Sequence, residues 1–343
     1  MNDLNRLNPL FRPQEHGRWQ LVEPGIWSRA AERPPDDPTT AILKTLSDQP
    51  RWLEAHYLYD DRGSDLFERI CDLPEYYLTR TENSILEARA PEIIAAAPVE
   101  CIVELGAGSS RKTVHLLEAQ LRQRGRGLFA PVDVSVPGLK ASREFVRRHL
   151  PGIDFHGLHA RYEEGFRSIA KELPTLFVFL GSTVGNFTPP AFARFFDRLS
   201  AAMGPGDFLL LGADRVKEPA VLEAAYADSR GLTAEFILNV FLHINRLTGS
   251  NFDLGRMRYV SRYNARWRQI EMEAVAAERQ RIDFPGAGAS FWWESGEPIL
   301  VEISRKFDPE QLQQQLGFFG LAPVAHYTDP LAWFSLLLFR KAD

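Results

Sequence analysis

The stretch CIVELGAGSSRKT, residues 101–113, decides the fold. An apolar run ends in the acid Glu104 and passes into a glycine loop, Gly106-Ala107-Gly108, after which a helix is expected. Loops of this kind place backbone N–H groups and the positive end of a helix beside a ligand. The same short pattern also serves as a plain turn between a strand and a helix. The stretch therefore predicts a strand, a loop and a helix, and leaves open whether the loop holds a cofactor.

Strands and helices alternate around this loop. Continuous apolar strands separated by helices are typical of a parallel sheet that is covered on both faces. The expected strands are VECIVELG (99–106), LFAPVDVS (128–135), DFHGLHA (154–160), TLFVFLGST (175–183) and DFLLLGAD (207–214). The chain ends in a helix and two strands that resemble the antiparallel closing pair of a methyltransferase sheet. We expect an α/β fold: a Rossmann-like, doubly wound methyltransferase sheet with an inserted second α+β substrate-binding domain.

Domain boundaries follow from changes in this pattern. Residues 1–38 are rich in Pro, Arg and Asp, and we expect them to form an irregular, partly disordered arm. A substrate-binding domain is expected from residues 39–79 together with 217–306, where the alternation of strand and helix breaks. The cofactor domain is expected from residues 80–216 together with 307–343. At 343 residues the chain is long enough for two cores.

Composition limits the classes of partner. Apolar residues make up 45% and charged residues 25%, as in an ordinary soluble protein. A net charge of -5 argues against a nucleic-acid partner. No apolar run is long enough to span a bilayer and no signal peptide is read, so we expect no membrane partner and a cytoplasmic location. Two cysteines and eight scattered histidines lack metal-ligand spacing. We expect a monomer without a metal that acts on a small molecule.

The glycine spacing and two acids distinguish between cofactors. The loop reads Gly-x-Gly and lacks the third glycine of the dinucleotide fingerprint, which disfavours a tightly packed pyrophosphate. Asp133 ends the next expected strand, where a carboxylate can accept from both hydroxyls of a ribose. Together with Glu104, this pattern resembles sites for S-adenosylmethionine more than sites for NAD. We therefore expect S-adenosylmethionine as the cofactor.

Several segments in combination carry a resemblance to one family. They are YDDRGSDLFERICDLPEYYLTRTE (59–82), ELGAGSSRKT (104–113), FLGSTVGNF (179–187), LLLGADRVKEPAVLEAAYADSRGLTAEFILNV (209–240) and EISRKF (302–307). They resemble the histidine-specific N-alpha-methyltransferases, which make trimethylhistidine (hercynine) in ergothioneine biosynthesis. The resemblance runs from about residue 40 to the end of the chain. It implies an enzyme that transfers methyl groups from S-adenosylmethionine to the α-amino nitrogen of L-histidine, three times in succession.

The resemblance also implies a set of cofactor-binding residues. Gly106 and Gly108 are expected to let the backbone approach the methionine part of the cofactor. Lys112 is expected to meet its carboxylate, and Asp133 to hold its ribose. The full set is Gly106, Gly108, Lys112, Asp133 and Tyr162.

One position departs from the family pattern. The family has an acid and an aromatic residue after the third strand, where the acid meets the adenine amino group. Here Arg161 replaces the acid, and Tyr162 keeps the aromatic ring. Backbone groups or Glu163 are the remaining candidates for holding the adenine.

The resemblance places another set of residues at the amino-acid substrate. Tyr59 and Asn186 are expected as catalytic residues that aim the lone pair of the amine. Asn186 also follows an expected parallel strand, and ligands lie at the carboxyl ends of such strands. Tyr76 and Tyr226 match contacts to the substrate carboxylate. The full set is Tyr59, Tyr76, Asn186, Tyr226, Met272, Glu302 and Ser304.

Glu302 and Ser304 lie in the strand-like run ILVEIS, where alternate side chains share a face. The expected faces are Leu300, Glu302 and Ser304 on one side and Ile299, Val301 and Ile303 on the other. A carboxylate can accept from one nitrogen of an imidazole while a hydroxyl pairs with the other. The resemblance assigns this pair to the imidazole of histidine. Spacing alone would equally allow a solvated strand face.

Other classes of function stay open at this stage. A dehydrogenase of the Rossmann type would need a third loop glycine and an acid or base at the hydride site, and neither is found. A macromolecular methyltransferase would need a basic or open surface, which the net charge of -5 disfavours. An N-methyltransferase acting on tryptophan or another small amine, partial methylation of histidine, and a cofactor-binding regulator without activity all remain possible.

Overall fold

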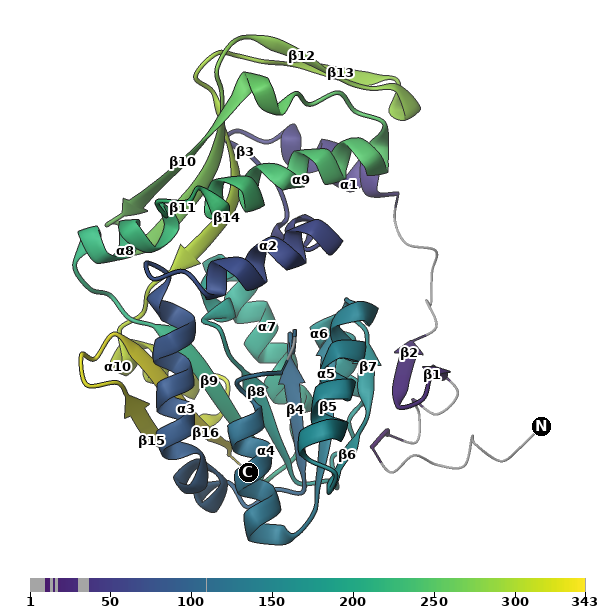
Figure 1. Ribbon diagram of the computed structural model, residues 1–343, viewed down its shortest axis with the longest axis vertical. Helices are drawn as coiled ribbons and strands as arrows, with labels where there is room; N and C mark the ends of the chain where they lie inside the picture. Colours follow the sequence, from purple (N-terminus) through teal and green to yellow (C-terminus); the bar gives the residue numbers. More distant parts are fainter. Residues whose placement is uncertain (1–9, 13–14, 16–17, 30–36, 109, 343) are drawn as a thin grey trace.

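A ten-stranded mixed sheet forms the lower part of the molecule in Figure 1. The computed structural model describes residues 10–12, 15, 18–29, 37–108 and 110–342. The strand order is β1-β2-β7-β5-β4-β8-β9-β16-β15, and β6 pairs with β5. These strands are β1 (Trp19–Glu23), β2 (Ile26–Arg29), β4 (Cys101–Leu105), β5 (Gly127–Asp133), β6 (Ile153–Phe155), β7 (Gly157–His159), β8 (Thr175–Phe179), β9 (Phe208–Asp214), β15 (Leu321–Thr328) and β16 (Phe334–Lys341).

The centre of this sheet is parallel, as expected. Strand β4 pairs in parallel with β5 and β8, and β8 pairs in parallel with β9. Every residue of β4, β8 and β9 is buried, because helices cover both faces. These helices are α3 (Tyr77–Ala96), α4 (Val114–Arg124), α5 (Val136–His149), α6 (Tyr162–Ser168), α7 (Pro189–Ala202) and α10 (Pro309–Gly317). Strand β16 lies antiparallel between β9 and β15, which confirms the closing pair.

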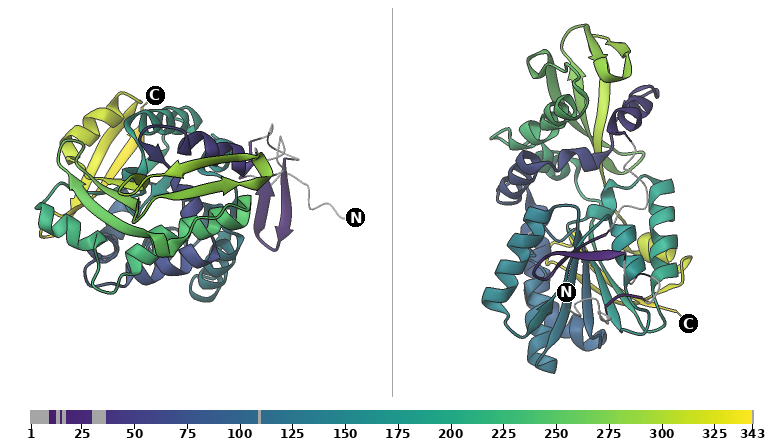
Figure 2. Two further views of the ribbon diagram at one scale, coloured as in Figure 1. Left: turned by 90° about the horizontal axis from the view of Figure 1, so that it is seen from above. Right: turned by 90° about the vertical axis from the view of Figure 1, so that its right-hand side faces the viewer.

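Two local expectations about this sheet were wrong. The expected third strand is divided into β6 and β7, because His156 leaves the strand and donates its backbone N–H to Phe129. The N-terminal arm is not irregular throughout: residues 19–29 form the β1–β2 hairpin, and β2 adds in parallel to β7. This hairpin lies at the edge of the sheet (Figure 2, right). The expected disorder of the arm falls largely outside the described residues.

A four-stranded sheet with the order β10-β11-β14-β3 lies above the larger one (Figures 1 and 2). Its strands are β3 (Arg51–Trp52), β10 (Met257–Asn264), β11 (Gln269–Ala276) and β14 (Pro298–Arg305). The hairpin of β12 (Gln280–Phe284) and β13 (Ala289–Trp293) extends from it and was not expected. The helical elements here are α1 (Pro38–Leu46), η2 (Ala55–Leu58), α2 (Asp61–Cys71), α8 (Pro219–Tyr226), α9 (Leu232–Thr248), η4 (Leu254–Arg256) and η5 (Pro285–Ala287).

Two segments that connect the upper and lower parts run side by side. Phe307 donates its N–H to the carbonyl of Asp214 at 2.8 Å, and Val216 donates to the carbonyl of Phe307 at 3.1 Å. Both segments lie beside the carboxyl end of β9, where a doubly wound sheet binds its ligands. The division into a cofactor domain and a substrate-binding domain remains a proposal, and this arrangement supports it. Within the described ranges, no helix combines the length and apolar character needed to cross a membrane.

Candidate active site

The glycine loop after β4 lies against Tyr162 and Asp133. Gly106 has a φ of +79°, and a Cβ at this position would come within 2.7 Å of the Tyr162 hydroxyl. Glycine is therefore required both by the backbone and by the close approach of the tyrosine. Gly108 donates its N–H to Oδ2 of Asp133 at 3.1 Å. The structure thus brings four of the five expected cofactor residues to one edge of the sheet.

Glu104 offers a direct test of whether this loop fits a cofactor with a positive charge. Thr113 donates to its Oε1, whereas its buried Oε2 has no hydrogen-bond partner among the described residues. The nearby Ser110 hydroxyl is engaged with Ser142 at 2.7 Å. Burial raises the pKa of Glu104 to about 8. An amino group of a ligand would satisfy the free oxygen and favour the ionised carboxylate.

Lys112, the fifth expected residue, is held by an acid that the sequence analysis did not single out. Its ammonium pairs with Glu82 of α3, a side chain with no exposed surface. The same carboxylate accepts the N–H of Gly181 at 2.9 Å with both of its oxygens. Glu82 therefore connects α3, the turn before α4 and the loop after β8. A contact from Lys112 to the cofactor carboxylate stays a prediction.

The region expected to hold adenine lies at the start of α6. The ring of Tyr162 meets Phe179 edge to face, with 5.6 Å between the ring centres. Arg161 is the N-cap residue of this helix, and its backbone N–H donates to the carboxylate of Glu164 at 3.1 Å. Glu163 forms an ion pair with Arg198 of α7, so its carboxylate already has a partner. This geometry favours backbone groups over Glu163 as the contact to adenine.

Asn186 and Glu302 meet directly, although they are far apart in the sequence. Asn186 ends the short helix η3 (Thr183–Asn186) after β8, and its Nδ2 donates to Oε1 of Glu302 at 2.8 Å. A Cβ on Gly185 would lie 2.8 Å from the carbonyl oxygen of Arg305, so glycine allows this loop to touch β14. Burial raises the pKa of Glu302 to about 8, and Lys306 partly opposes that shift.

Ser304 shares the Glu302 face of β14, as expected, but the prediction for the start of this strand was wrong. Opposite β14 on β11, Met272 pairs with Glu302 while Glu273 pairs with Leu300, so Val301 forms a bulge. The bulge reverses the alternation, and Leu300 therefore lies on the opposite face from Glu302. Met272 is buried and pairs with Glu302, so it lies on the same face, and its contact with the substrate stays a prediction.

A cluster of aromatic rings lies near Glu302. Tyr59 meets Phe67 and Phe236 edge to face, at 5.8 and 5.7 Å between ring centres. Tyr76 meets Tyr226 in the same way at 5.9 Å. Tyr59 is 37% exposed, yet burial of its hydroxyl, together with the nearby Glu302, raises its pKa well above the usual value. The phenol therefore stays protonated and cannot serve as a strong base.

Comparison with known proteins identifies the family to which this site belongs. Residues 38–341 match the family described as "Histidine-specific methyltransferase, SAM-dependent". The chain belongs to this family. The N-terminal hairpin lies outside the matched residues. S-adenosylmethionine is the cofactor, which confirms the prediction made from the glycine spacing and Asp133.

Three named proteins are similar to this chain over most of its length. A histidine N-alpha-methyltransferase of Mycobacterium tuberculosis is 40% identical over 301 residues, which are 88% of this chain and 94% of that protein. A histidine N-alpha-methyltransferase of Mycolicibacterium smegmatis is 39% identical over 293 residues, or 85% of this chain and 91% of that protein. Ergothioneine biosynthesis protein 1 of Neurospora crassa is 32% identical over 293 residues, or 82% of this chain and 32% of that protein.

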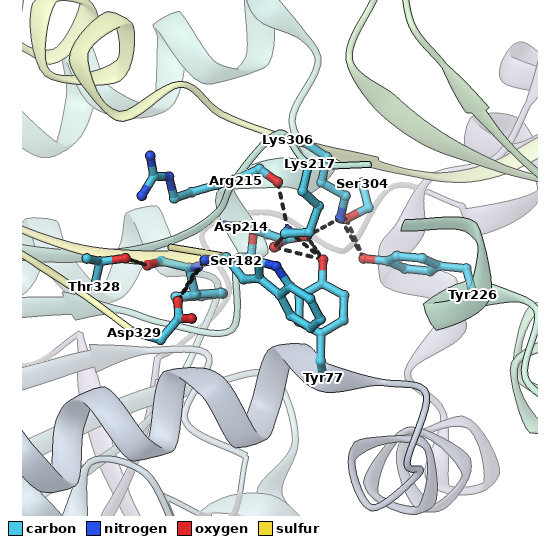
Figure 3. Close-up of polar contacts among 12 residues, drawn as sticks. Tyr77, Ser182, Asp214, Arg215, Lys217, Tyr226, Ser304, Lys306, Thr328 and Asp329 are labelled. Carbon is cyan, nitrogen blue, oxygen red and sulfur yellow. Dashed lines mark hydrogen bonds and ion pairs between the residues drawn. The ribbon is translucent and has the colours of Figure 1, made fainter. Parts of the chain in front are cut away.

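This member of the histidine-specific methyltransferase family has a charged network around Asp214, next to Ser304 (Figure 3). Asp214, at the end of β9, accepts from Tyr77 at 2.8 and 2.9 Å and pairs with Lys217 and Lys306. Burial lowers the pKa of Lys217 to about 8. The sequence analysis missed this cluster. Its one signal was the position of Asp214 at the carboxyl end of a parallel strand, where functional groups gather.

Proposed function

We propose that the chain transfers methyl groups from S-adenosylmethionine to the α-amino nitrogen of L-histidine, three times in succession, to give the trimethylated amino acid of ergothioneine biosynthesis. The observation that carries this proposal is the pair of Glu302 and Ser304, whose side chains share one face of β14. A carboxylate and a hydroxyl lie side by side on β14, and Asn186, which ends η3 after β8, contacts that carboxylate at 2.8 Å. The family and the names of the relatives support the same substrate.

The two ends of the site have different tasks in this proposal. Glu104, Asp133 and the glycine loop hold the cofactor, which supplies a methyl group on a sulfonium. Tyr59 and Asn186 orient the amine so that its lone pair lies in line with the carbon–sulfur bond. Since alignment accounts for much of the rate in such transfers, no strong base is needed once the amine has lost its proton. This agrees with a Tyr59 phenol that stays protonated.

The surface of Glu302 and Ser304 would read the side chain of the substrate. Glu302 accepts from one imidazole nitrogen, and Ser304 pairs with the other. A site built to hydrogen-bond a substrate group rejects analogues that lack it, because its buried polar atoms are left unpaired. Tryptophan lacks a second ring nitrogen and is larger. Histidine should therefore be strongly preferred over tryptophan, phenylalanine and alanine.

The test is steady-state methylation of histidine and tryptophan by the wild type and by Glu302→Ala. Loss of one buried partner costs about 1–3 kcal/mol. The Michaelis constant for histidine should therefore rise by roughly tenfold or more, with little change in cofactor affinity. The preference for histidine over tryptophan should also fall.

Glu273→Ala is the matched control for this measurement. Glu273 is buried like Glu302 but lies on the neighbouring strand, where it pairs with Arg262 at 2.9 Å. This variant should keep the wild-type preference. If Glu302→Ala left the ratio of histidine to tryptophan unchanged, this face would not contact the imidazole.

A further inference from the structure

The ammonium of Lys306 contacts the hydroxyl of Ser304 (Figure 3). The side chain of Lys306 has no exposed area. It pairs with Asp214 at 2.8 Å and donates to the hydroxyls of Tyr226 and Ser304, both at 2.9 Å. An ammonium has three protons and no acceptor. These three partners use all of its protons. Lys306 therefore has no proton left for a ligand, and its hydrogen bonds reach a ligand only through the two hydroxyls that it contacts.

The positions of the hydroxyl protons follow from counting. The oxygens of Tyr226 and Ser304 are 2.8 Å apart, so one proton lies between them. A phenol is more acidic than an aliphatic alcohol and is the better donor, so Tyr226 donates to Ser304. Oγ of Ser304 then accepts from both Tyr226 and Lys306, which fills its two acceptor sites. Its own proton is left to point away from both, toward the face that it shares with Glu302.

We infer that Lys306 is a positioning residue that fixes Ser304 as a hydrogen-bond donor and so selects substrates whose side chain presents an unprotonated ring nitrogen. The inference rests on the proposed function, because it takes this face to contact the imidazole. With Ser304 donating and Glu302 accepting, the pocket fits a neutral imidazole, which has one N–H and one lone pair. Without Lys306, Ser304 regains a free acceptor site and can also pair with an N–H.

Lys217 provides a matched control because it shares Asp214 with Lys306. Its ammonium donates to the hydroxyl of Tyr77 and to the carbonyl of Arg215, both at 2.7 Å. Both lysines are buried and pair with the carboxylate of Asp214, but only Lys306 contacts Ser304. In Lys306→Met, Asp214 keeps Lys217 and Tyr77 as partners. The substitution therefore does not leave that carboxylate buried alone.

The experiment compares histidine with two kinds of analogue in the wild type, Lys306→Met and Lys217→Met. The 2- and 3-pyrrolylalanines keep a ring N–H and lose the acceptor nitrogen, and the better of the two is used. Thiazolylalanine keeps an acceptor nitrogen and loses the N–H. In Lys306→Met, the preference in kcat/KM for histidine over pyrrolylalanine should fall by about tenfold, the value of one hydrogen bond. The preference over thiazolylalanine depends on Glu302, on which Lys306 acts only through its charge, and should fall much less.

The outcomes distinguish a positioning role of Lys306 from a purely structural role. An equal loss of both preferences in Lys306→Met, or the same loss in Lys217→Met, would assign Lys306 a structural role only and overturn the inference. Unchanged preferences in Lys306→Met would also overturn it. A wild type that does not methylate histidine would overturn the proposed function itself, and this inference with it.

A second variant covers the case in which Lys306→Met does not fold. Tyr226→Phe removes the other proton donor to Ser304 and should produce the same selective loss of preference over pyrrolylalanine. Tyr226 is also expected to contact the carboxylate of the substrate. Histidine and pyrrolylalanine carry the same carboxylate, so any such effect cancels in the ratio of their kcat/KM values. An unchanged ratio in Tyr226→Phe would contradict the proton arrangement.

Discussion

Glu302 shows how one buried carboxyl group can couple substrate recognition to pH. Burial raises its pKa to about 8, while the amide of Asn186 donates to it at 2.8 Å. In the ligand-free protein at pH 7 the carboxyl group is therefore largely protonated. An ionised carboxylate accepts a stronger hydrogen bond than a neutral acid does. Binding of an imidazole N–H should therefore improve as the pH rises through about 8.

Binding of trimethylated histidine tests this coupling, because its quaternary nitrogen does not titrate and its imidazole is already mostly neutral at about pH 7. A group with a pKa of about 8 is roughly one-tenth ionised at pH 7. The affinity of the wild type should therefore rise by about tenfold between pH 7 and pH 9. Glu302→Gln keeps an acceptor for Asn186 without a titrating group, and its affinity should stay flat. Isothermal titration calorimetry with both proteins checks this, and equal pH profiles would contradict it.

At the scale of the element, the β1–β2 hairpin extends the sheet beyond the part that matches the family. Trp19 is 3% exposed and stacks on Phe11 with 5.2 Å between ring centres. Its Nε1 donates to the hydroxyl of Ser168 at 3.1 Å. This packing ties the hairpin to α6. The hairpin therefore contributes to the stability of the sheet edge, away from Glu302 and Ser304.

Trp19→Ala should lower the free energy of unfolding by about 3–5 kcal/mol, because it removes a large buried ring. Urea denaturation followed by circular dichroism measures this change. Val22→Ala in the same hairpin, at a side chain that is 50% exposed, should change stability by less than about 0.5 kcal/mol. At a temperature where both variants are folded, methylation of histidine should match the wild type. Equal stability of the two variants would mean that the hairpin does not pack as described.

The elements that the sequence predicted best are those with a strong local pattern. The apolar run of β4 and the glycine loop predicted a strand, a turn and a helix correctly, because the sheet buries both faces of that strand. The β1–β2 hairpin was missed because it lies in a stretch rich in Pro and charged residues. The bulge at Val301 could not be seen, since it depends on the register with β11. Long-range pairing, rather than local propensity, determines such features.

At the scale of the whole molecule, the site is assembled where segments from both sheets meet. Asp214 ends strand β9 of the parallel sheet and Asn186 ends η3 after β8, whereas Glu302, Ser304 and Lys306 come from β14 and the residue after it. The family resemblance predicts the identities of many candidate site residues, and their roles stay predictions. The direct contact of Asn186 with Glu302 and the buried network of Asp214 could not, because they join residues that the sequence separates widely.

The most direct test of the proposed histidine methylation is to follow where the methyl group of the cofactor is transferred. The protein is mixed with S-adenosylmethionine that carries a ¹³C-labelled methyl group and with an equimolar set of the common amino acids. Nuclear magnetic resonance and mass spectrometry then locate and count the labelled groups. The account predicts label on the α-nitrogen of histidine alone, reaching three methyl groups. Label on the imidazole ring, on tryptophan or on another amino acid in preference to histidine would contradict it.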